Sequence, residues 1–230
     1  MRAYILCGGF GTRLSAVLQG GQKAVVDVHG RPFLALVLAQ LKLAGVEDAV
    51  LCAHYRADQL AELLPGLAAE SGLNLQLVVE TQPMGTGGAV LNALRAVPPG
   101  DRFLVLNADT WLDQQAYHLA ITAQQDAIVA VLVEDRSRYG SLDCTDDLEL
   151  LALNEKGASG PGRVNAGVYA FGEDSLSEFA VQPCSMEKEI LPRLIERRQL
   201  FACEYSGPFV DIGTPDSLNA FKSGLQGTDI

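Results

Sequence analysis

Short apolar runs alternate with longer amphipathic segments along this chain. Runs that are apolar throughout are typical of buried strands, and longer segments with apolar residues on one side are typical of helices that cover a sheet. We predict strands at Ala3–Cys7, Ala49–Ala53, Leu75–Val79, Phe103–Leu106, Ile128–Val133 and Val164–Phe171. We predict helices directly after Pro32 and over Leu60–Leu67, Gly87–Leu94 and Met186–Arg197. This alternation predicts an α/β fold, in which a mixed, mostly parallel sheet is flanked by helices.

Prolines divide the second half of the chain. Pro192 lies inside the last predicted helix, and because proline lacks a backbone N–H it predicts a break or a new helix start there. Thr214 followed by Pro215 has the pattern of an N-cap residue with proline at the first helical position. The sequence contains no internal repeat, low-complexity segment or linker, so we expect one domain over residues 1–230.

Composition and charge limit the partners that this chain can bind. A hydrophobic content of 48% with 20% charged residues is typical of a soluble globular protein. The formal net charge of −11 disfavours long-range attraction to nucleic acid or to an anionic membrane. No segment approaches the roughly 18 consecutive apolar residues of a membrane span, and the first apolar run is too short for a signal peptide. An anionic substrate must therefore be held by a few local cations or by a metal ion.

The cysteines and histidines are few and widely separated. Five cysteines are an odd number, and the three histidines have no metal-ligand spacing. We therefore predict reduced thiols, with neither a disulfide framework nor a zinc site, and a cytoplasmic location.

A glycine cluster follows the first predicted strand. Residues 8–13 read Gly-Gly-Phe-Gly-Thr-Arg, and Lys23 follows ten residues after Arg13. Glycines after a buried strand let the backbone turn tightly and bring N–H groups close to an anion, and arginine can contact two phosphate oxygens at once. The pattern matches neither the dinucleotide fingerprint nor the P-loop. We interpret it as a polyphosphate site; the alternative is an ordinary strand-to-helix turn with two solvated cations.

Two aspartates follow apolar runs at positions where α/β proteins bind ligands. Asp109 comes after the strand at Phe103–Leu106, and Asp211 follows the short run Phe209-Val210. Carboxylates at two strand ends can share one Mg²⁺, which prefers oxygen ligands and substrate phosphates. The alternative is that each aspartate caps a helix or a turn.

A second glycine-rich segment runs from Glu80 to Gly88. It follows a predicted strand and leads into a helix, so we expect it to wrap a flat ligand such as a nucleobase. The Glu80 carboxylate can accept two hydrogen bonds at once, which suits the adjacent N–H donors of guanine; the alternative is a solvated loop glutamate.

Two polar motifs occur in the second half of the chain. Glu155-Lys156 follows an apolar run and is either an exposed charged pair or a site for a phosphate and hydroxyl groups. Asn165 and Gly167 interrupt an apolar strand, which suggests that a ligand approaches the backbone closely there.

In chain order, these motifs resemble those of the sugar-1-phosphate nucleotidyltransferases, also called nucleotide-sugar pyrophosphorylases. The similarity spans nearly the whole chain and is carried by residues 8–13 with Lys23, Glu80–Gly88, Asn107-Ala108-Asp109, Glu155-Lys156, Asn165-Ala166-Gly167 and residues 211–215. The chain is most similar to the short guanylyltransferases that act on D-glycero-D-manno-heptose 1-phosphate or mannose 1-phosphate. Tyr139-Gly140 and the Ser185-x-Glu187 segment also match that subgroup.

The resemblance implies a Rossmann-like nucleotide-diphospho-sugar transferase fold and a role for each matched residue. The nucleotide would be bound by Leu6, Gly8, Gly9, Gly11, Thr12, Glu80, Gly85 and Thr86, and Arg13 and Lys23 would be catalytic and neutralise its phosphates. The sugar phosphate would be bound by Asn107, Tyr139, Gly140, Glu155, Lys156 and Asn165, and Mg²⁺ would be held by Asp109 and Asp211. The implied reaction converts an NTP, with GTP expected, and a sugar 1-phosphate to an NDP-sugar and pyrophosphate by in-line attack on the α-phosphate.

The chain departs from the family pattern around Lys23. Family members usually carry Pro-Lys-Pro where this chain has Gln22-Lys23-Ala24, so the charge is kept but its placement is less rigid. Alternatives therefore stay open: a uridylyl-, cytidylyl- or thymidylyltransferase, a molybdopterin guanylyltransferase, or a nucleotide-sugar-binding protein without activity. We expect no C-terminal β-helix domain, and either a monomer or a small homo-oligomer.

Overall fold

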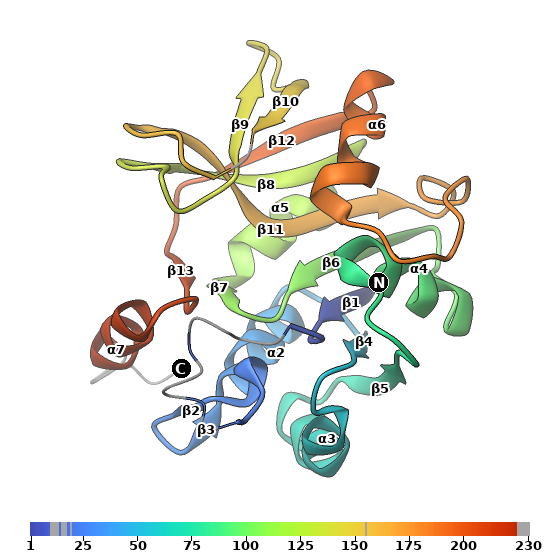
Figure 1. Ribbon diagram of the computed structural model, residues 1–230, viewed down its shortest axis with the longest axis vertical. Helices are drawn as coiled ribbons and strands as arrows, with labels where there is room; N and C mark the ends of the chain where they lie inside the picture. The colour runs from blue at the N-terminus through green and yellow to red at the C-terminus, as the bar shows by residue number, and fades with distance from the viewer. Residues whose placement is uncertain (10–13, 15–17, 19, 155, 225–230) are drawn as a thin grey trace.

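Four parallel strands form the centre of the sheet, and they are the buried apolar runs of the first half of the chain. The computed structural model shown in Figure 1 describes residues 1–9, 14, 18, 20–154 and 156–224. The four strands lie in the order β6 (Arg102–Asn107), β1 (Arg2–Leu6), β4 (Asp48–Ala53) and β5 (Asn74–Val79). Each was predicted to within one residue at either end. Their carboxyl ends therefore meet along one edge of the sheet.

The second half of the chain extends this sheet with mostly antiparallel strands. The long strand β11 (Gly162–Gly172) pairs antiparallel with β6 and with β8 (Asp126–Val133). The sheet of nine strands is completed by β9 (Ser141–Cys144), β10 (Leu150–Asn154) and β12 (Leu200–Tyr205). In Figure 1 these later strands lie above the parallel centre. The predicted mixed, mostly parallel sheet is confirmed, with its parallel strands at the centre. Strand β12, which runs parallel to β8, was not predicted.

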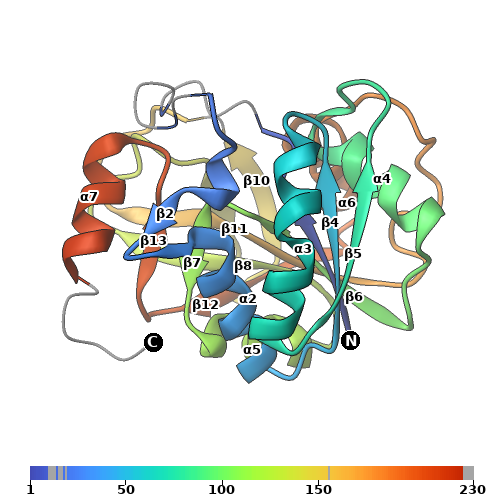
Figure 2. The same cartoon turned by 90° about the horizontal axis from the view of Figure 1, so that it is seen from below.

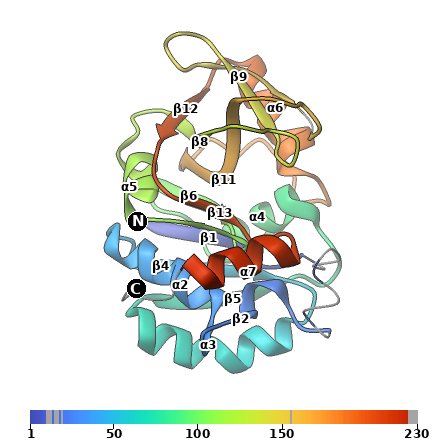
Figure 3. The ribbon, with the colours of Figure 1, turned by 90° about the vertical axis from the view of Figure 1, so that its left-hand side faces the viewer.

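Helices cover both faces of the sheet, and the alternation of side chains along the strands explains why. In β1, Ala3 and Ile5 belong to one apolar core and Tyr4 to the other. One face is covered by α2 (Phe33–Leu43), α3 (Ala57–Ser71), α5 (Gln114–Thr122) and α7 (Pro215–Gly224). The other is covered by α4 (Gly85–Ala96), the π-helix η3 (Met186–Ile190) and α6 (Leu191–Glu196). Figure 2 shows α2 and α3 side by side over one face, and Figure 3 shows α7 in red on the side that faces the viewer.

The prolines act as predicted. The helix over 186–197 is divided into η3 and α6, with Pro192 in the first turn of α6. The Thr214 hydroxyl accepts a hydrogen bond from the Ser217 N–H at 3.2 Å, and α7 begins at Pro215. Across the described parts of the chain, every helix is too short or too polar to cross a lipid bilayer.

Two short ribbons lie outside the main sheet. The first joins β2 (Asp27–Val28) to β3 (Arg31–Pro32), and the second joins β7 (Thr110–Leu112) to β13 (Phe209–Asp211). Asp211 lies at the end of a strand, as predicted, but that strand is β13 of the second ribbon and not a strand of the main sheet. Asp211 pairs with Thr110 across the second ribbon, and the Ile212 N–H donates to the Asp109 carbonyl at 3.0 Å. This antiparallel pairing brings Asp211 next to Asp109.

Candidate active site

Two cavities open side by side where the central strands end. The first, of about 370 Å³, lies beyond the carboxyl end of β1 and is called the β1 cavity here. The second, of about 300 Å³, is lined by Asn165, Ala166 and Gly167 of β11 and is called the β11 cavity. Asn107, Asp109 and Glu187 line both. The two cavities therefore meet, and a ligand in one can contact a ligand in the other.

Lys23 lies beside both predicted metal ligands at this junction. Its Nζ donates to Asp109 Oδ2 at 2.5 Å and lies 3.9 Å from Asp211 Oδ1. The Lys23 side chain is 15% exposed, so the ammonium partly neutralises two carboxylates in a sheltered place. The same Asp211 oxygen also accepts the Gly213 N–H. The charge that the family pattern requires is thus present in this chain at the meeting point of the cavities.

The donor set around Lys23 suits a magnesium ion that is also bound by substrate. Within the described residues, no group of three or more histidine, cysteine, aspartate and glutamate side chains could hold a metal by itself. Mg²⁺ keeps several waters and is usually bound by one or two carboxylates together with substrate phosphates. Asp109 and Asp211 supply two carboxylates, so these residues fit Mg²⁺ in a complex with a phosphate ligand.

Gln22 holds the backbone just before Lys23. The Gln22 side chain is 1% exposed, and its Nε2 donates to the carbonyl oxygens of Cys7 and Tyr55, the second at 3.4 Å. Its backbone N–H donates to Gln59 Oε1 at 3.0 Å. The buried glutamine therefore ties the segment that carries Lys23 to the chain beyond the ends of β1 and β4. We interpret it as a substitute for the proline that family members usually have at this position.

Glu80 is buried beside the glycine turn that follows β1. The residue is 7% exposed, and its Oε2 accepts the Met84 N–H at 2.9 Å, which closes the loop over 80–84. Burial raises the pKa of this carboxyl above its ordinary value, and the Met84 N–H and His54 partly offset the rise. A β-carbon on Gly8 would lie 3.5 Å from the other carboxylate oxygen, Oε1. Glu80 is therefore not the solvated loop residue of the alternative interpretation, because it lines the β1 cavity.

The glycines after Glu80 serve the packing of the protein itself. A β-carbon on Gly85 would lie 2.5 Å from the Cys184 carbonyl oxygen, and one on Gly88 would lie 2.4 Å from that of Gln182. The N–H groups of Gly87 and Gly88 donate to the Cys184 carbonyl at 3.0 and 3.2 Å. The expectation that this whole segment wraps a ligand therefore needs correction. Gly85 and Thr86 line the β1 cavity, whereas Gly87 and Gly88 let the chain before η3 lie against the first turn of α4.

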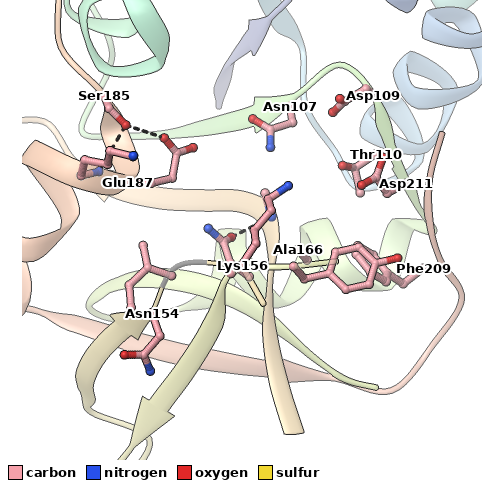
Figure 4. Close-up of a pocket in the computed structure, with 16 residues that line it drawn as sticks. Asn107, Asp109, Thr110, Asn154, Lys156, Ala166, Ser185, Glu187, Phe209 and Asp211 are labelled. Carbon is pink, nitrogen blue, oxygen red and sulfur yellow. Dashed lines mark hydrogen bonds between the residues drawn. The ribbon is translucent and has the colours of Figure 1, made fainter. Parts of the chain in front are cut away.

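The β11 cavity is lined by side chains of mixed chemistry. Figure 4 shows the Lys156 ammonium reaching into the space between Glu187 on one side and Asp109 and Asp211 on the other. The Tyr139 and Phe209 rings are in contact, with centroids 5.3 Å apart, and form an apolar wall. A phosphate bound to Lys156 would lie between these surfaces.

The backbone at Gly167 lies close to the Asn107 side chain and orients it. Gly167 has a φ of +74°, and a β-carbon there would lie 2.4 Å from Asn107 Nδ2. Asn165 supports this turn, because its Oδ1 accepts the Gly167 N–H at 2.8 Å and its Nδ2 donates to the Tyr169 hydroxyl at 2.9 Å. The glycine in β11 thus makes room for an asparagine side chain, where the sequence suggested a ligand.

Every predicted site residue that the structure describes lines one or both cavities. The β1 cavity has Leu6, Gly8, Gly9, Lys23, Glu80, Gly85 and Thr86, the β11 cavity has Tyr139, Gly140, Lys156, Asn165 and Asp211, and Asn107 and Asp109 line both. Gly11, Thr12, Arg13 and Glu155 lie outside the described residues. The role of each residue stays a prediction. Sequence reasoning gave no role to His54, Ser185 or Glu187, although the Ser185-x-Glu187 spacing was the available signal.

Known proteins with similar sequences and structures are nucleotidyltransferases. The chain is 28% identical to D-glycero-alpha-D-manno-heptose 1-phosphate guanylyltransferase of Campylobacter jejuni, over 96% of this chain and 98% of the relative. It is 32% identical to mannose-1-phosphate guanyltransferase of Saccharomyces cerevisiae, over 99% of this chain but only 64% of that longer protein. The crystal structure of HddC from Yersinia pseudotuberculosis superposes with a TM-score of 0.86 at 30% identity, over 97% of this chain and 99% of HddC.

The same Yersinia protein also matches in a complex with the nucleotide analogue GMP-PN, with a TM-score of 0.83. The family model described as nucleotidyl transferase matches residues 2–226. This match includes both cavities and all four central strands. The chain therefore belongs to the nucleotidyl transferase family.

Proposed function

We propose that this protein is a sugar-1-phosphate guanylyltransferase, which joins GTP to D-glycero-D-manno-heptose 1-phosphate or mannose 1-phosphate. The observation that carries the proposal is the junction of two cavities at Asn107, Asp109 and Glu187. A transferase of this kind must hold two phosphorylated substrates so that their phosphates meet, and here two cavities meet beside Lys23 and two carboxylates. The names of the Campylobacter and yeast relatives support the choice of base and of sugar.

The β1 cavity suits the nucleotide. Gly8 and Gly9 leave room for a ligand above the end of β1, and Glu80 lies beside them with one carboxylate oxygen near Gly8. We assign to the ionised Glu80 the two adjacent N–H donors of guanine. The nucleotide phosphates would then extend toward Lys23 and Asp109, and we assign Arg13, Gly11 and Thr12 to them on the family pattern.

The β11 cavity suits the sugar phosphate. Lys156 supplies a cation for the phosphate, while Asn165 and the Tyr139–Gly140 backbone surround the space for the sugar ring. Glu155 is assigned to sugar hydroxyls on the family pattern. This arrangement directs the sugar phosphate toward Asn107 and Asp109, where the other cavity ends.

The proposed reaction needs no covalent enzyme intermediate. An oxygen of the sugar phosphate forms a bond to the α-phosphorus of GTP, and the bond from that phosphorus to the β-phosphate oxygen breaks, so that pyrophosphate leaves on the opposite side. Lys23 and Arg13 would neutralise negative charge on the phosphates and hold them in line. Asp109 and Asp211 would hold Mg²⁺, which when bound supplies further positive charge to the phosphate oxygens.

We place the enzyme in the cytoplasm. All five cysteines are free thiols, and two of them, Cys7 and Cys52, are buried in the core beside the β1 cavity and within the sheet. Free thiols are typical of a reducing compartment.

The test is pyrophosphate release with Mg²⁺, measured for each nucleoside triphosphate against mannose, glucose, N-acetylglucosamine and D-glycero-D-manno-heptose 1-phosphates. We expect release with GTP and a manno-configured sugar. Release only with another base would contradict the role of Glu80 and leave the transferase mechanism intact. No release from any pair, in protein that binds a nucleotide by calorimetry, would overturn the proposed activity.

A further inference from the structure

Glu187 and Asp109 are the acidic residues that line both cavities in the described part of the chain, and Glu187 comes from the second half of the sequence. It lies in the π-helix η3 and lines both cavities. Figure 4 shows its carboxylate joined to Ser185 by a hydrogen bond, with the other carboxylate oxygen on the side of Asn107. A π-turn is a rare conformation that is frequent at functional sites, and here it places Glu187 beside both cavities.

The glycines of α4 fix this position. Because Gly85 and Gly88 have no side chains, the backbone of residues 182–184 lies directly against the start of α4. The Cys184 N–H donates to the Met84 carbonyl at 2.9 Å, and the Met186 N–H donates to the Thr86 hydroxyl at 2.9 Å. The segment that leads to Glu187 is therefore attached to the start of α4, beside the β1 cavity, by these two hydrogen bonds and by the close packing at Gly85 and Gly88.

The Glu187 carboxylate is held by hydroxyl groups. Its Oε2 accepts hydrogen bonds from the Thr86 hydroxyl at 2.7 Å and from the Ser185 hydroxyl at 3.0 Å. Both contacts use the same oxygen, which orients the second oxygen, Oε1, independently of any ligand. By contrast, Asp109 and Asp211 are within ion-pair distance of Lys23. The hydrogen bonds to Glu187 thus come from hydroxyl groups, whereas the ion pairs of Asp109 and Asp211 are made with Lys23.

We propose that Glu187 is a specificity residue that accepts hydrogen bonds from ring hydroxyls of the sugar 1-phosphate through Oε1. This inference rests on the proposed function and names a residue and a chemical group within it. An ionised carboxylate accepts two hydroxyl donors and gives stronger hydrogen bonds than a neutral acceptor. The contact from Thr86 to the same carboxylate also makes the geometry of the sugar contact depend on the start of α4, which lines the nucleotide cavity.

The test compares Glu187→Ala and Glu187→Gln with wild type on a series of deoxy sugar 1-phosphates. Glu187→Ala should lower kcat/KM for the preferred sugar by about 10- to 100-fold, as expected for loss of a hydrogen bond to a charged group, with the KM for GTP unchanged. Glu187→Gln keeps the shape and should lose less. On the deoxy analogue that lacks the contacted hydroxyl, wild type and Glu187→Ala should have equal kcat/KM. A readout without turnover supports the same point: Glu187→Ala should bind GDP as wild type does and GDP-sugar more weakly.

Glu196→Gln is the matched control, because Glu196 is exposed on α6 and lines neither cavity. A raised KM for GTP or a shifted Mg²⁺ dependence in Glu187→Gln, with sugar binding unchanged, would overturn the inference in favour of a phosphate or metal role. Equal loss on every deoxy sugar would also overturn it. If wild type is active and Glu187→Ala equals it, the inference alone fails, whereas an inactive wild type contradicts the proposed function itself.

Discussion

Gln22 provides a quantitative test of how this chain positions Lys23. Its side chain is 1% exposed, and Nε2 donates to the carbonyl oxygens of Cys7 and Tyr55. The Tyr55 contact is long, at 3.4 Å, so the Cys7 carbonyl is the main partner. Replacing Gln22 with alanine removes both donors and leaves the Cys7 carbonyl in a buried place without this partner.

The expected loss of stability follows from these contacts. Leaving a buried acceptor unsatisfied costs about 1–3 kcal/mol, so we expect Gln22→Ala to lower the free energy of unfolding by about 2 kcal/mol. For a chain of this size, that corresponds to a fall in Tm of about 4–8 °C. Lys23 follows directly in the chain, and a shift of about 1 Å in a catalytic group can reduce turnover about 100-fold. We therefore expect kcat at 25 °C, well below Tm, to fall by about tenfold or more.

Two further variants separate positioning from stability. Gln22 has a φ of −84°, which is close to the range that proline adopts, so Gln22→Pro should fix the backbone without any side-chain donor. We expect it to recover turnover relative to Gln22→Ala, although it also loses the N–H that donates to Gln59. Unfolding by urea and steady-state kinetics measure the two effects. If Gln22→Ala loses stability while its kcat equals that of wild type, the glutamine has only a structural role and the reasoning is refuted.

Three more substitutions test the charged groups of the site. Lys23→Ala should lower kcat at least about 100-fold. It should lower the free energy of unfolding by only about 1 kcal/mol, because the ion pair between Lys23 and Asp109 is partly exposed. A Lys23→Ala protein that unfolds more easily but keeps its activity would contradict the phosphate role. Asp109→Asn should abolish Mg²⁺-dependent turnover, and unchanged activity across a Mg²⁺ titration would remove Asp109 from the metal site. Burial raises the pKa of Glu80 above 4.5, so its ionised form, which we propose accepts the guanine donors, is lost at a higher pH as the pH falls. GTP binding by wild type should therefore weaken relative to Glu80→Gln as the pH falls through that raised pKa, and parallel pH profiles of the two proteins would refute the base-reading role. The same shift means that the protonated form of Glu80 favours folding, so this contribution to stability is complete below pH 4.5 and is lost as the pH rises through the pKa in the folded protein.

The central strands could be predicted because burial on both faces makes them continuously apolar. Residues 103–106 of β6, for example, are all fully buried, and their run of apolar side chains is visible without knowledge of the fold. Helix α5 has no such signal, because its buried face consists of Ala116, Tyr117 and Ala120, and two alanines contribute little hydrophobic contrast. Strand β12 was missed for a similar reason, since only three of its six residues are buried.

The candidate site was predictable where it depends on strand ends and not where it depends on distant pairing. Asn107 and Asp109 follow β6 directly, so their place at the edge of the sheet follows from the strand itself. The position of Asp211 depends on the pairing of β13 with β7, about a hundred residues earlier in the chain, which no local pattern indicates. Gln22 is a further case, because its partners are backbone carbonyls of residues 7 and 55 that only the folded chain brings together.

At two glycines the sequence correctly predicts a close approach but not the group that makes it. Gly88 and Gly167 lie at the cavities or beside them, as the interpretation of close approach requires, but the groups that approach them belong to the protein: the Gln182 carbonyl and the Asn107 amide. A sequence indicates that a close approach occurs at a glycine, and it does not say whether a ligand or another part of the chain makes it. In this protein the two are connected, since the chain that packs on α4 carries Glu187, and the side chain that packs on Gly167 is Asn107. The glycines therefore shape the junction of the cavities indirectly, by allowing the backbone to bring two polar side chains to it.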